Sequence, residues 1–215
     1  MGKVISGIAL GFSGKVGNMI FSQQPDGTVT VREAPNPEQL PPPTEQQLRA
    51  QMDTALASNI TGAMKGFLDV SYSIQSKLDK MNQNNSCASF IKLNLLLGEY
   101  PNRSVDMSRL LVSRGQMRAP EEATVTVNET GLSFTWNPET KDPGEHYSDQ
   151  IMVIAYFPAL KISKYKISGA QRYSGQDILR LDGAKKGNTA VVYIAFISDD
   201  HKKMSDSVYL GEINW

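Results

Sequence analysis

The chain has 215 residues, 40% of them hydrophobic and 20% charged, so it is long and apolar enough for one large or two small folded domains. Its 22 basic and 22 acidic side chains balance, and this lack of a basic excess argues against binding to nucleic acid. The single cysteine excludes an internal disulfide, and with two histidines it leaves little for a zinc site. We therefore expect no nucleic-acid partner, no cofactor and no metal. A net charge of zero gives little self-repulsion, which suits a protein that associates with its own copies.

The hydropathy pattern gives no sign of a membrane protein, because no stretch approaches the roughly 18 apolar residues of a membrane span. The apolar run at residues 4–10 is short for a signal peptide, and no small-x-small cleavage site follows it. We therefore expect a soluble protein that has no membrane partner and is not exported by a signal-peptide route.

Glycines recur at every third position from Gly11 to Gly17, just before two short β-prone runs at residues 19–21 and 28–31. An Asp-Gly pair lies between the runs and predicts a hairpin, because tight hairpin turns need the positive φ that glycine adopts without strain. The hairpin precedes any stretch able to form a core, so we expect residues 1–38 to be an arm that docks on something else. The residues to which we assign a role in assembly are Gly11, Gly14, Lys15, Gly17, Phe21, Gly27 and Arg32.

The same glycines are similar to a phosphate-binding loop, but their context argues against that function. A Walker A loop requires a hydroxyl residue after its Gly-Lys pair, whereas Val16 follows Gly14 and Lys15 here. The spacing G-x-x-G-x-x-G also differs from the dinucleotide pattern, and both patterns need a helix N-terminus after the loop. We therefore assign the glycines to backbone geometry, with a positive φ at Gly17.

A proline-rich stretch at residues 35–43 follows the arm and favours extended polyproline geometry. Extended, it reaches roughly 28 Å at about 3.1 Å per residue, and we favour a spacer over a ligand for a proline-binding domain. A capping box at residues 44–47 predicts the start of a helix, which apolar residues at three- and four-residue steps continue to Phe67. Two further helices are expected at about residues 70–81 and 84–96.

The apolar period changes to two after residue 123, and turn residues interrupt the sequence at short intervals. Seven strands are expected, near residues 123–127, 132–136, 150–157, 164–168, 177–181, 190–196 and 207–213. This pattern predicts an antiparallel β-sandwich that resembles a fibronectin type III or Ig-like module. The side chains expected in its core are Phe134, Trp136, Tyr193 and Ala195.

The predicted fold class is therefore α+β with three parts. These are the β-hairpin arm at residues 1–38, a small helical region at residues 39–115 with a proline-rich lead-in, and the sandwich at residues 116–215. Because the period changes between the last two parts, we expect the sandwich to fold alone.

No catalytic constellation can be recognised in the sequence. Asp199, Asp200 and His201 are adjacent, but consecutive residues in a turn point in different directions and two lysines follow them, which disfavours a metal site. His146 lies in another expected loop, and no G-x-S-x-G motif supports a hydrolase. Cys87 lies near a helix start, where we expect a buried small hydrophobe rather than a reactive thiolate.

Several short motifs, taken in chain order, resemble a known family over essentially the whole chain. They are GFSGKVGNMIF at residues 11–21, Arg32, Asn36-Pro37, Gln46-Gln47, Tyr100-Pro101-Asn102, LVSRG at 111–115, LSFTW at 132–136 and YIAFIS at 193–198. The family consists of uncharacterised proteins of about this length from Bacteroides-group bacteria and their phages and prophages. Its members usually carry a Trp-Lys-Gly-type hairpin tip, where this chain has QQPDG at residues 23–27. The family has no established activity, so the resemblance implies a setting rather than a mechanism.

These features together predict a non-enzymatic structural assembly protein, namely a phage or prophage virion component of the neck, ring or tail. Its expected partners are copies of itself, reached by strand addition through the arm, and other virion or assembly proteins. Its expected location is the virion, assembled in the host bacterial cytoplasm, or the cytoplasm if the protein is not phage-derived. One alternative is a binding module that recognises a carbohydrate or a protein through sandwich loops near His146 and Asp199. Another is an enzyme whose site carries no recognised motif.

Overall fold

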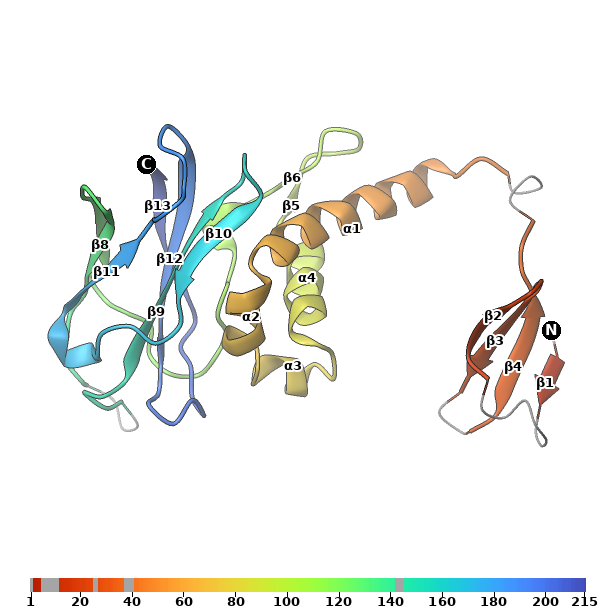
Figure 1. Ribbon diagram of the computed structural model, residues 1–215, viewed down its shortest axis with the longest axis horizontal. Helices are drawn as coiled ribbons and strands as arrows, with labels where there is room; N and C mark the ends of the chain where they lie inside the picture. The colour runs from red at the N-terminus through yellow and green to blue at the C-terminus, as the bar shows by residue number, and fades with distance from the viewer. Residues whose placement is uncertain (1, 5–11, 25–26, 37–40, 142–144) are drawn as a thin grey trace. The chain divides into compact units, whose positions relative to one another are not determined.

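The computed structural model describes residues 2–4, 12–24, 27–36, 41–141 and 145–215. The chain divides into two compact units, Met1–Glu45 and Gln46–Trp215, and each is described by itself. Along the chain, Figure 1 shows a set of short strands, then helices, then a second and larger set of strands. The predicted α+β class is therefore confirmed.

The first unit is a four-stranded antiparallel sheet with the strand order β1-β4-β3-β2. Its strands are β1 (Gly2–Val4), β2 (Gly14–Val16), β3 (Met19–Gln23) and β4 (Val29–Glu33). The predicted hairpin is confirmed as β3 and β4, which pair in register with Met19 opposite Glu33. The prediction did not include β1 and β2, because each has three residues, one of them glycine, and gives no strand signal. Asp26 of the expected turn lies outside the described residues.

The first and last of the helices that follow begin close to where the sequence predicts, but the first ends at Ala63 rather than continuing to Phe67. The helices are α1 (Glu45–Ala63), α2 (Lys65–Ser71), α3 (Gln75–Leu78) and α4 (Gln83–Asn94). Helix α4 begins after Asn82, whose side chain accepts a hydrogen bond of 2.8 Å from the backbone N–H of Asn85. The helix expected at residues 70–81 corresponds only to the last residues of α2 and to α3. The apolar side chains of Leu78 and Met81, which a continuous helix over residues 70–81 was expected to bury, are exposed.

The strands of the C-terminal part match the prediction closely, and all seven expected strands are present. They are β7 (Thr124–Val127), β8 (Gly131–Thr135), β9 (Gln150–Phe157), β10 (Ile162–Lys166), β11 (Gln176–Arg180), β12 (Thr189–Ile197) and β13 (Val208–Asn214). They form a three-stranded sheet, β11-β8-β7, and a four-stranded sheet, β10-β9-β12-β13. Shorter elements are the strands β5 (Leu96–Leu97) and β6 (Ser104–Val105) and the 3₁₀ helices η3 (Met107–Arg109) and η4 (Arg172–Ser174).

The two central strands of the four-stranded sheet, β9 and β12, are buried on both faces. Alternate residues of each strand pack against β8 and β11 in a core between the two sheets. The residues between them pack against α1, α2 and α4, around Met64, Phe67, Tyr72 and Ile91. The second unit is thus a helical layer, a four-stranded sheet and a three-stranded sheet (Figure 1).

The residues expected in the sandwich core are all buried, but they belong to two different cores. Phe134 and Trp136 lie between the sheets, where Trp136 Nε1 donates a hydrogen bond of 2.9 Å to the carbonyl oxygen of Arg172. Tyr193 and Ala195 lie on the other face of β12, in the core shared with the helices. The sequence pattern identified burial at these positions but not the face, because β12 is apolar on both sides.

The expected boundary between residues 115 and 116 lies inside the second unit. The helices pack directly on the outer face of the four-stranded sheet, so the helical layer and the sandwich share one core. Removing the helices would expose Met152, Ile154, Tyr156, Val191 and Tyr193, all of which are buried in the structure.

This shared core makes a prediction about fragments that revises the expectation of a sandwich that folds alone. Residues 46–215 should give a cooperative urea unfolding transition, whereas residues 118–215 should be insoluble or unfold without cooperativity, because one face of β9 and β12 is then bare. Circular dichroism at increasing urea concentration measures both. A cooperative transition of residues 118–215 would show that the two sheets fold without the helices.

Candidate functional site

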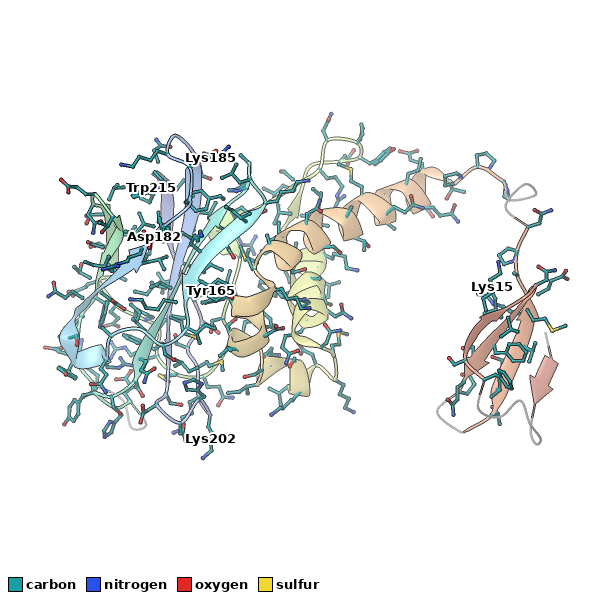
Figure 2. The ribbon with its side chains drawn as sticks, in the orientation of Figure 1. Lys15, Tyr165, Asp182, Lys185, Lys202 and Trp215 are labelled. Atoms are coloured by element: carbon teal, nitrogen blue, oxygen red, sulfur yellow. The ribbon has the colours of Figure 1, made fainter. Side chains whose placement is uncertain are left out.

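The N-terminal sheet carries most of the residues to which the sequence assigns a role, and its register sorts them onto two faces. Residues directly opposite each other in antiparallel strands share a face. One face is mostly apolar, with Val16, Met19, Phe21, Val29 and Val31 on it, and the same register places Gln23 and Glu33 at its two ends. The opposite face is polar and basic, with Lys15, Ser22, Thr30 and Arg32 around Ile20 (Figure 2 labels Lys15).

The apolar face is covered only in part. Val29 is fully buried, and the rings of Phe12 and Phe21 pack with 5.8 Å between their centroids. However, Phe12, Val16 and Met19 are 44%, 52% and 54% exposed. These three side chains with Phe21 and Val31 are called the apolar face below.

Gly17 has the backbone conformation that the sequence predicts. Its φ is +59°, and it occupies the first position of the two-residue turn that joins Val16 of β2 to Met19 of β3. A side chain at Gly17 would meet nothing within 4 Å, so the requirement is for φ and not for space. Gly14 and Gly27 also have positive φ, and Gly11 lies outside the described residues.

The loop at residues 198–203 uses its carboxylates to hold its own turn. Asp200 accepts hydrogen bonds from Ser198 Oγ at 2.7 Å and from the backbone N–H of Lys202 at 3.1 Å, and these bonds lower the pKa of Asp200 to about 2. Asp199 accepts a bond of 3.2 Å from the side chain of Gln150. Across the part of the chain that the structure describes, no group of three His, Cys, Asp or Glu residues could hold a metal ion.

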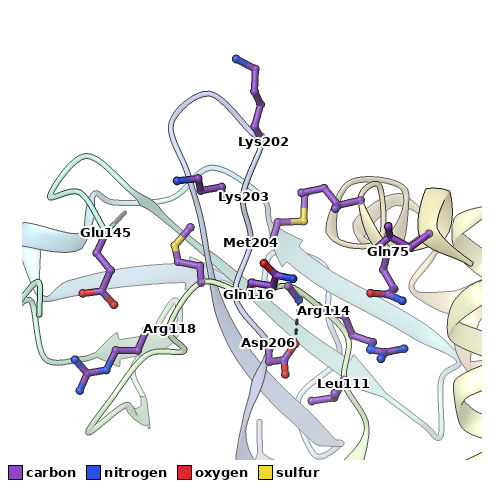
Figure 3. A pocket seen from close by; sticks show the side chains of 14 residues that line it. Gln75, Leu111, Arg114, Gln116, Arg118, Glu145, Lys202, Lys203, Met204 and Asp206 are labelled. Atoms are coloured by element: carbon purple, nitrogen blue, oxygen red, sulfur yellow. Dashed lines mark hydrogen bonds between the residues drawn. The ribbon is translucent and has the colours of Figure 1, made fainter. Parts of the chain in front are cut away.

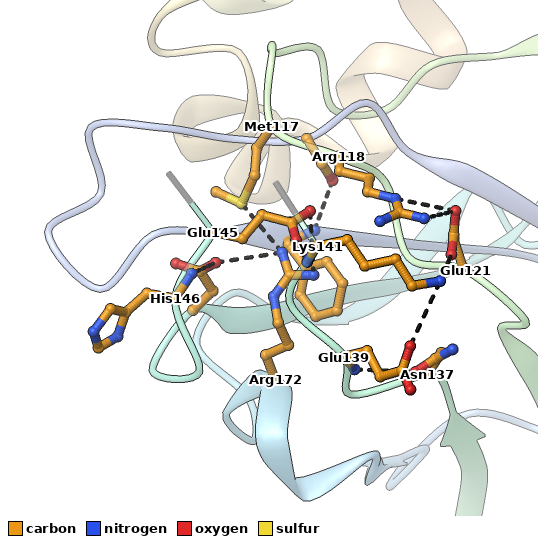
Figure 4. A network of polar contacts seen from close by, with 12 residues as sticks. Met117, Arg118, Glu121, Asn137, Glu139, Lys141, Glu145, His146 and Arg172 are labelled. Atoms are coloured by element: carbon orange, nitrogen blue, oxygen red, sulfur yellow. Dashed lines mark hydrogen bonds and ion pairs between the residues drawn. The ribbon is translucent and has the colours of Figure 1, made fainter. Parts of the chain in front are cut away.

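Figure 4 shows a buried ionic cluster at one end of the sandwich that no sequence motif signalled. The guanidinium of Arg172 lies 3.3 Å from Asp149 and 3.7 Å from Glu145, and all three side chains are buried. The same group stacks over the ring of Phe196 and donates a hydrogen bond to the sulfur of Met117. Removing one partner of a buried ion pair costs about 3–5 kcal/mol. We therefore infer that this cluster stabilises the loops at this end of the sandwich.

Two exposed tyrosines lie beside the ionic cluster. Tyr147 and Tyr173 are 61% and 62% exposed, and the backbone N–H of Tyr173 donates a hydrogen bond of 3.3 Å to the carbonyl of Tyr147. The ring of His146 lies 5.3 Å from that of Tyr147 and bonds to Ser148 Oγ at 2.7 Å. His146 therefore belongs to an aromatic surface.

Comparison with known proteins supplies a family. Residues 11–211 match DUF6266, which is described as a family of unknown function. The chain belongs to the DUF6266 family. The match covers β2, β3 and β4 of the N-terminal sheet and almost all of the second unit. No curated protein and no solved structure matches the chain. None of the helices in the described ranges is both long and apolar enough to span a bilayer.

The thiol of Cys87 gives a direct chemical prediction. It is fully buried, and burial raises its pKa to about 12, so it holds almost no thiolate at neutral pH. We expect no reaction of the native protein with Ellman's reagent at pH 8 and one equivalent of reaction in 6 M guanidinium chloride. Rapid stoichiometric reaction of the native protein would contradict this burial.

Proposed function

We propose that the protein is a non-enzymatic structural component that forms a homo-oligomer through its N-terminal sheet, and that it works in the neck, ring or tail of a phage or prophage virion. The observation that carries the proposal is the exposed apolar face of a sheet that belongs to a separate compact unit of the chain. The virion setting is supported by the family resemblance.

The two faces of the sheet differ in a way that favours association through one of them. Fully burying a large apolar side chain contributes about 1.5–3 kcal/mol, so covering the exposed halves of Phe12, Val16 and Met19 contributes roughly 1 kcal/mol each. Lys15 and Arg32 keep the opposite face in water, because burying an unpaired charge is costly. Association through the apolar face alone would therefore bury the exposed apolar side chains and leave Lys15 and Arg32 in water.

A second copy of the chain is the occupant that the charges favour. The apolar face of one copy can pack on the same face of another about a two-fold axis, which needs no separate partner surface. The whole chain has a net charge of zero, so two copies approach without net repulsion.

A pair of variants on strand β3 tests the surface. Met19→Glu places a second carboxylate beside Glu33 on the apolar face and should reduce the number of subunits, whereas Ser22→Glu places the same charge on the polar face and should leave it unchanged. Deletion of residues 1–35 should abolish the oligomer while the second unit stays folded. Native mass spectrometry and circular dichroism measure these outcomes.

Two results would overturn the proposal. A monomeric full-length protein at high concentration would exclude homo-oligomeric assembly, and an equal oligomer after the deletion would place the interface elsewhere. The virion setting has its own check, because particles purified after prophage induction should contain the protein. Particles without it would refute that setting and leave arm-dependent assembly standing.

A binding module is a second candidate function, favoured by the aromatic surface of His146, Tyr147 and Tyr173. Exposed aromatic side chains beside polar groups are typical of binding sites, and sugar rings offer C–H faces for stacking together with hydroxyls for hydrogen bonds. The proposed ligand is a carbohydrate at this end of the sandwich.

A glycan array tests this candidate. The native protein should bind at least one class of glycan, and Tyr147→Ala with Tyr173→Ala should remove that binding. Ile178→Ala, which truncates another exposed side chain of the sandwich, serves as the control. Absence of binding by the native protein, or binding that survives the double substitution, would reject the candidate.

A further inference from the structure

A groove of about 690 Å³ lies in the second unit, between α3, the segment at residues 111–118 and the loop that precedes β13 (Figure 3). Its apolar lining comes from Ile74, Leu78, Leu111, Met117 and Met204. The volume is within the range of about 300–1,000 Å³ that is usual for ligand sites. No function described above uses this groove.

The segment at residues 111–118 forms one wall of the groove, and hydrogen bonds from both sides hold this wall in place. The hydroxyl of Tyr72 donates to the carbonyl of Leu111 and Ser71 Oγ donates to the carbonyl of Val112, both at 2.6 Å. From the other side, Ser113 Oγ donates to the carbonyl of Ser205 at 2.8 Å. The wall is therefore fixed to the helical layer and to the sandwich.

Gly115 permits a close approach inside this wall. A Cβ atom at Gly115 would lie 2.0 Å from the carbonyl oxygen of Met204, a distance that no side chain tolerates. This contact gives a physical reason for the glycine of the LVSRG motif.

From Arg114 to Met117 the backbone of this wall is paired only at every second residue. The N–H of Gly115 donates to the carboxylate of Asp206 and that of Met117 donates to the carbonyl of Met204, each at 2.9 Å. The backbone groups of Arg114 and Gln116, which alternate with them, have no hydrogen-bond partner within the described ranges. Such unpaired groups can bond to an extended peptide, as a sheet edge does in strand addition.

The charges around the groove favour an anion. Arg114, Arg118, Lys202 and Lys203 all line it, and Figure 3 shows Lys202 extending outward at the rim. The two carboxylates that also line it are engaged, since Asp206 accepts the bond from Gly115 and Glu145 faces the buried Arg172.

The four cationic side chains that line the groove differ in the contacts that they already make within the protein. Arg118 bonds to Glu121, Lys202 lies 3.3 Å from Asp200, and Arg114 stacks over Phe90. Lys203 makes no ion pair with any residue that the structure describes. It is therefore the cation most available to a ligand.

We propose that this groove binds an extended peptide segment of a partner protein, in which an Asp or Glu is next to a large apolar residue. The peptide backbone bonds to Arg114 and Gln116, its carboxylate pairs with Lys203, and its apolar side chain packs on Met117 and Met204. A charge-assisted hydrogen bond is roughly twice as strong as a neutral one, which favours acidic over neutral peptides.

A displayed library of random heptapeptides, selected on the immobilised full-length protein, tests the ligand class. The enriched sequences should combine an acidic residue with a neighbouring Leu, Met or Phe. Enrichment of basic sequences, or no enrichment above an empty surface, would overturn the proposal.

Variants then test the site with an enriched peptide measured by fluorescence polarisation. Lys203→Glu should weaken binding at least tenfold, and circular dichroism should show that this variant folds like the native protein. Lys185→Glu makes the same change at the opposite end of the sandwich from Lys202 (Figure 2) and should bind normally. Equal affinity of Lys203→Glu and the native protein would place the peptide elsewhere.

Native mass spectrometry of Lys203→Glu separates this inference from homo-oligomer assembly. The oligomer of the variant should equal that of the native protein, because the groove takes a foreign peptide. Loss of the oligomer in this variant would show that the occupant is a second copy and would overturn the choice of partner.

Discussion

Strands β9 and β12 pair antiparallel from Val191 opposite Tyr156 to Ile197 opposite Gln150, and both faces of this pair are buried. Successive residues point to opposite faces, so each residue contributes either to the core between the sheets or to the core under the helices. A slip of one residue would exchange the two sets of side chains. The register of this single pair therefore sets the packing of every layer in the second unit, including the helices that the chain forms before it.

The positions of the strands could be predicted from the sequence, but the number of layers could not. Turn residues and the period of two mark each strand, since these signals are local. The run at residues 151–157 is apolar without interruption, and such a run is typical of a strand covered on both faces. A single sandwich would leave one face in water, so this run was the available sign that the helices form a third layer.

The conformation of Gly17 and the β3–β4 hairpin could also be predicted, because both depend on neighbouring residues. The ionic cluster of Arg172, Asp149 and Glu145 could not, since no spacing rule links a buried arginine to its partners. The groove is harder still to predict, because its lining residues Arg114 and Lys203 come from distant parts of the chain and line one groove only after the sheets form. Local chemistry thus explains the elements, and tertiary packing explains both sites in the second unit.

The order of the layers along the chain has a consequence for synthesis on the ribosome. Helix α4 ends at Asn94, whereas β12, which covers the helical layer, ends only at Ile197. At the usual rate of about 5–20 residues per second, the helices emerge roughly 5–20 s before the strand that covers them. During that interval Met64, Phe67 and Ile91 lack β12 and, until Phe157 has been made, also β9, the two central strands that cover them. The nascent chain is therefore most prone to aggregation in the middle of translation, and the late strands end that exposure.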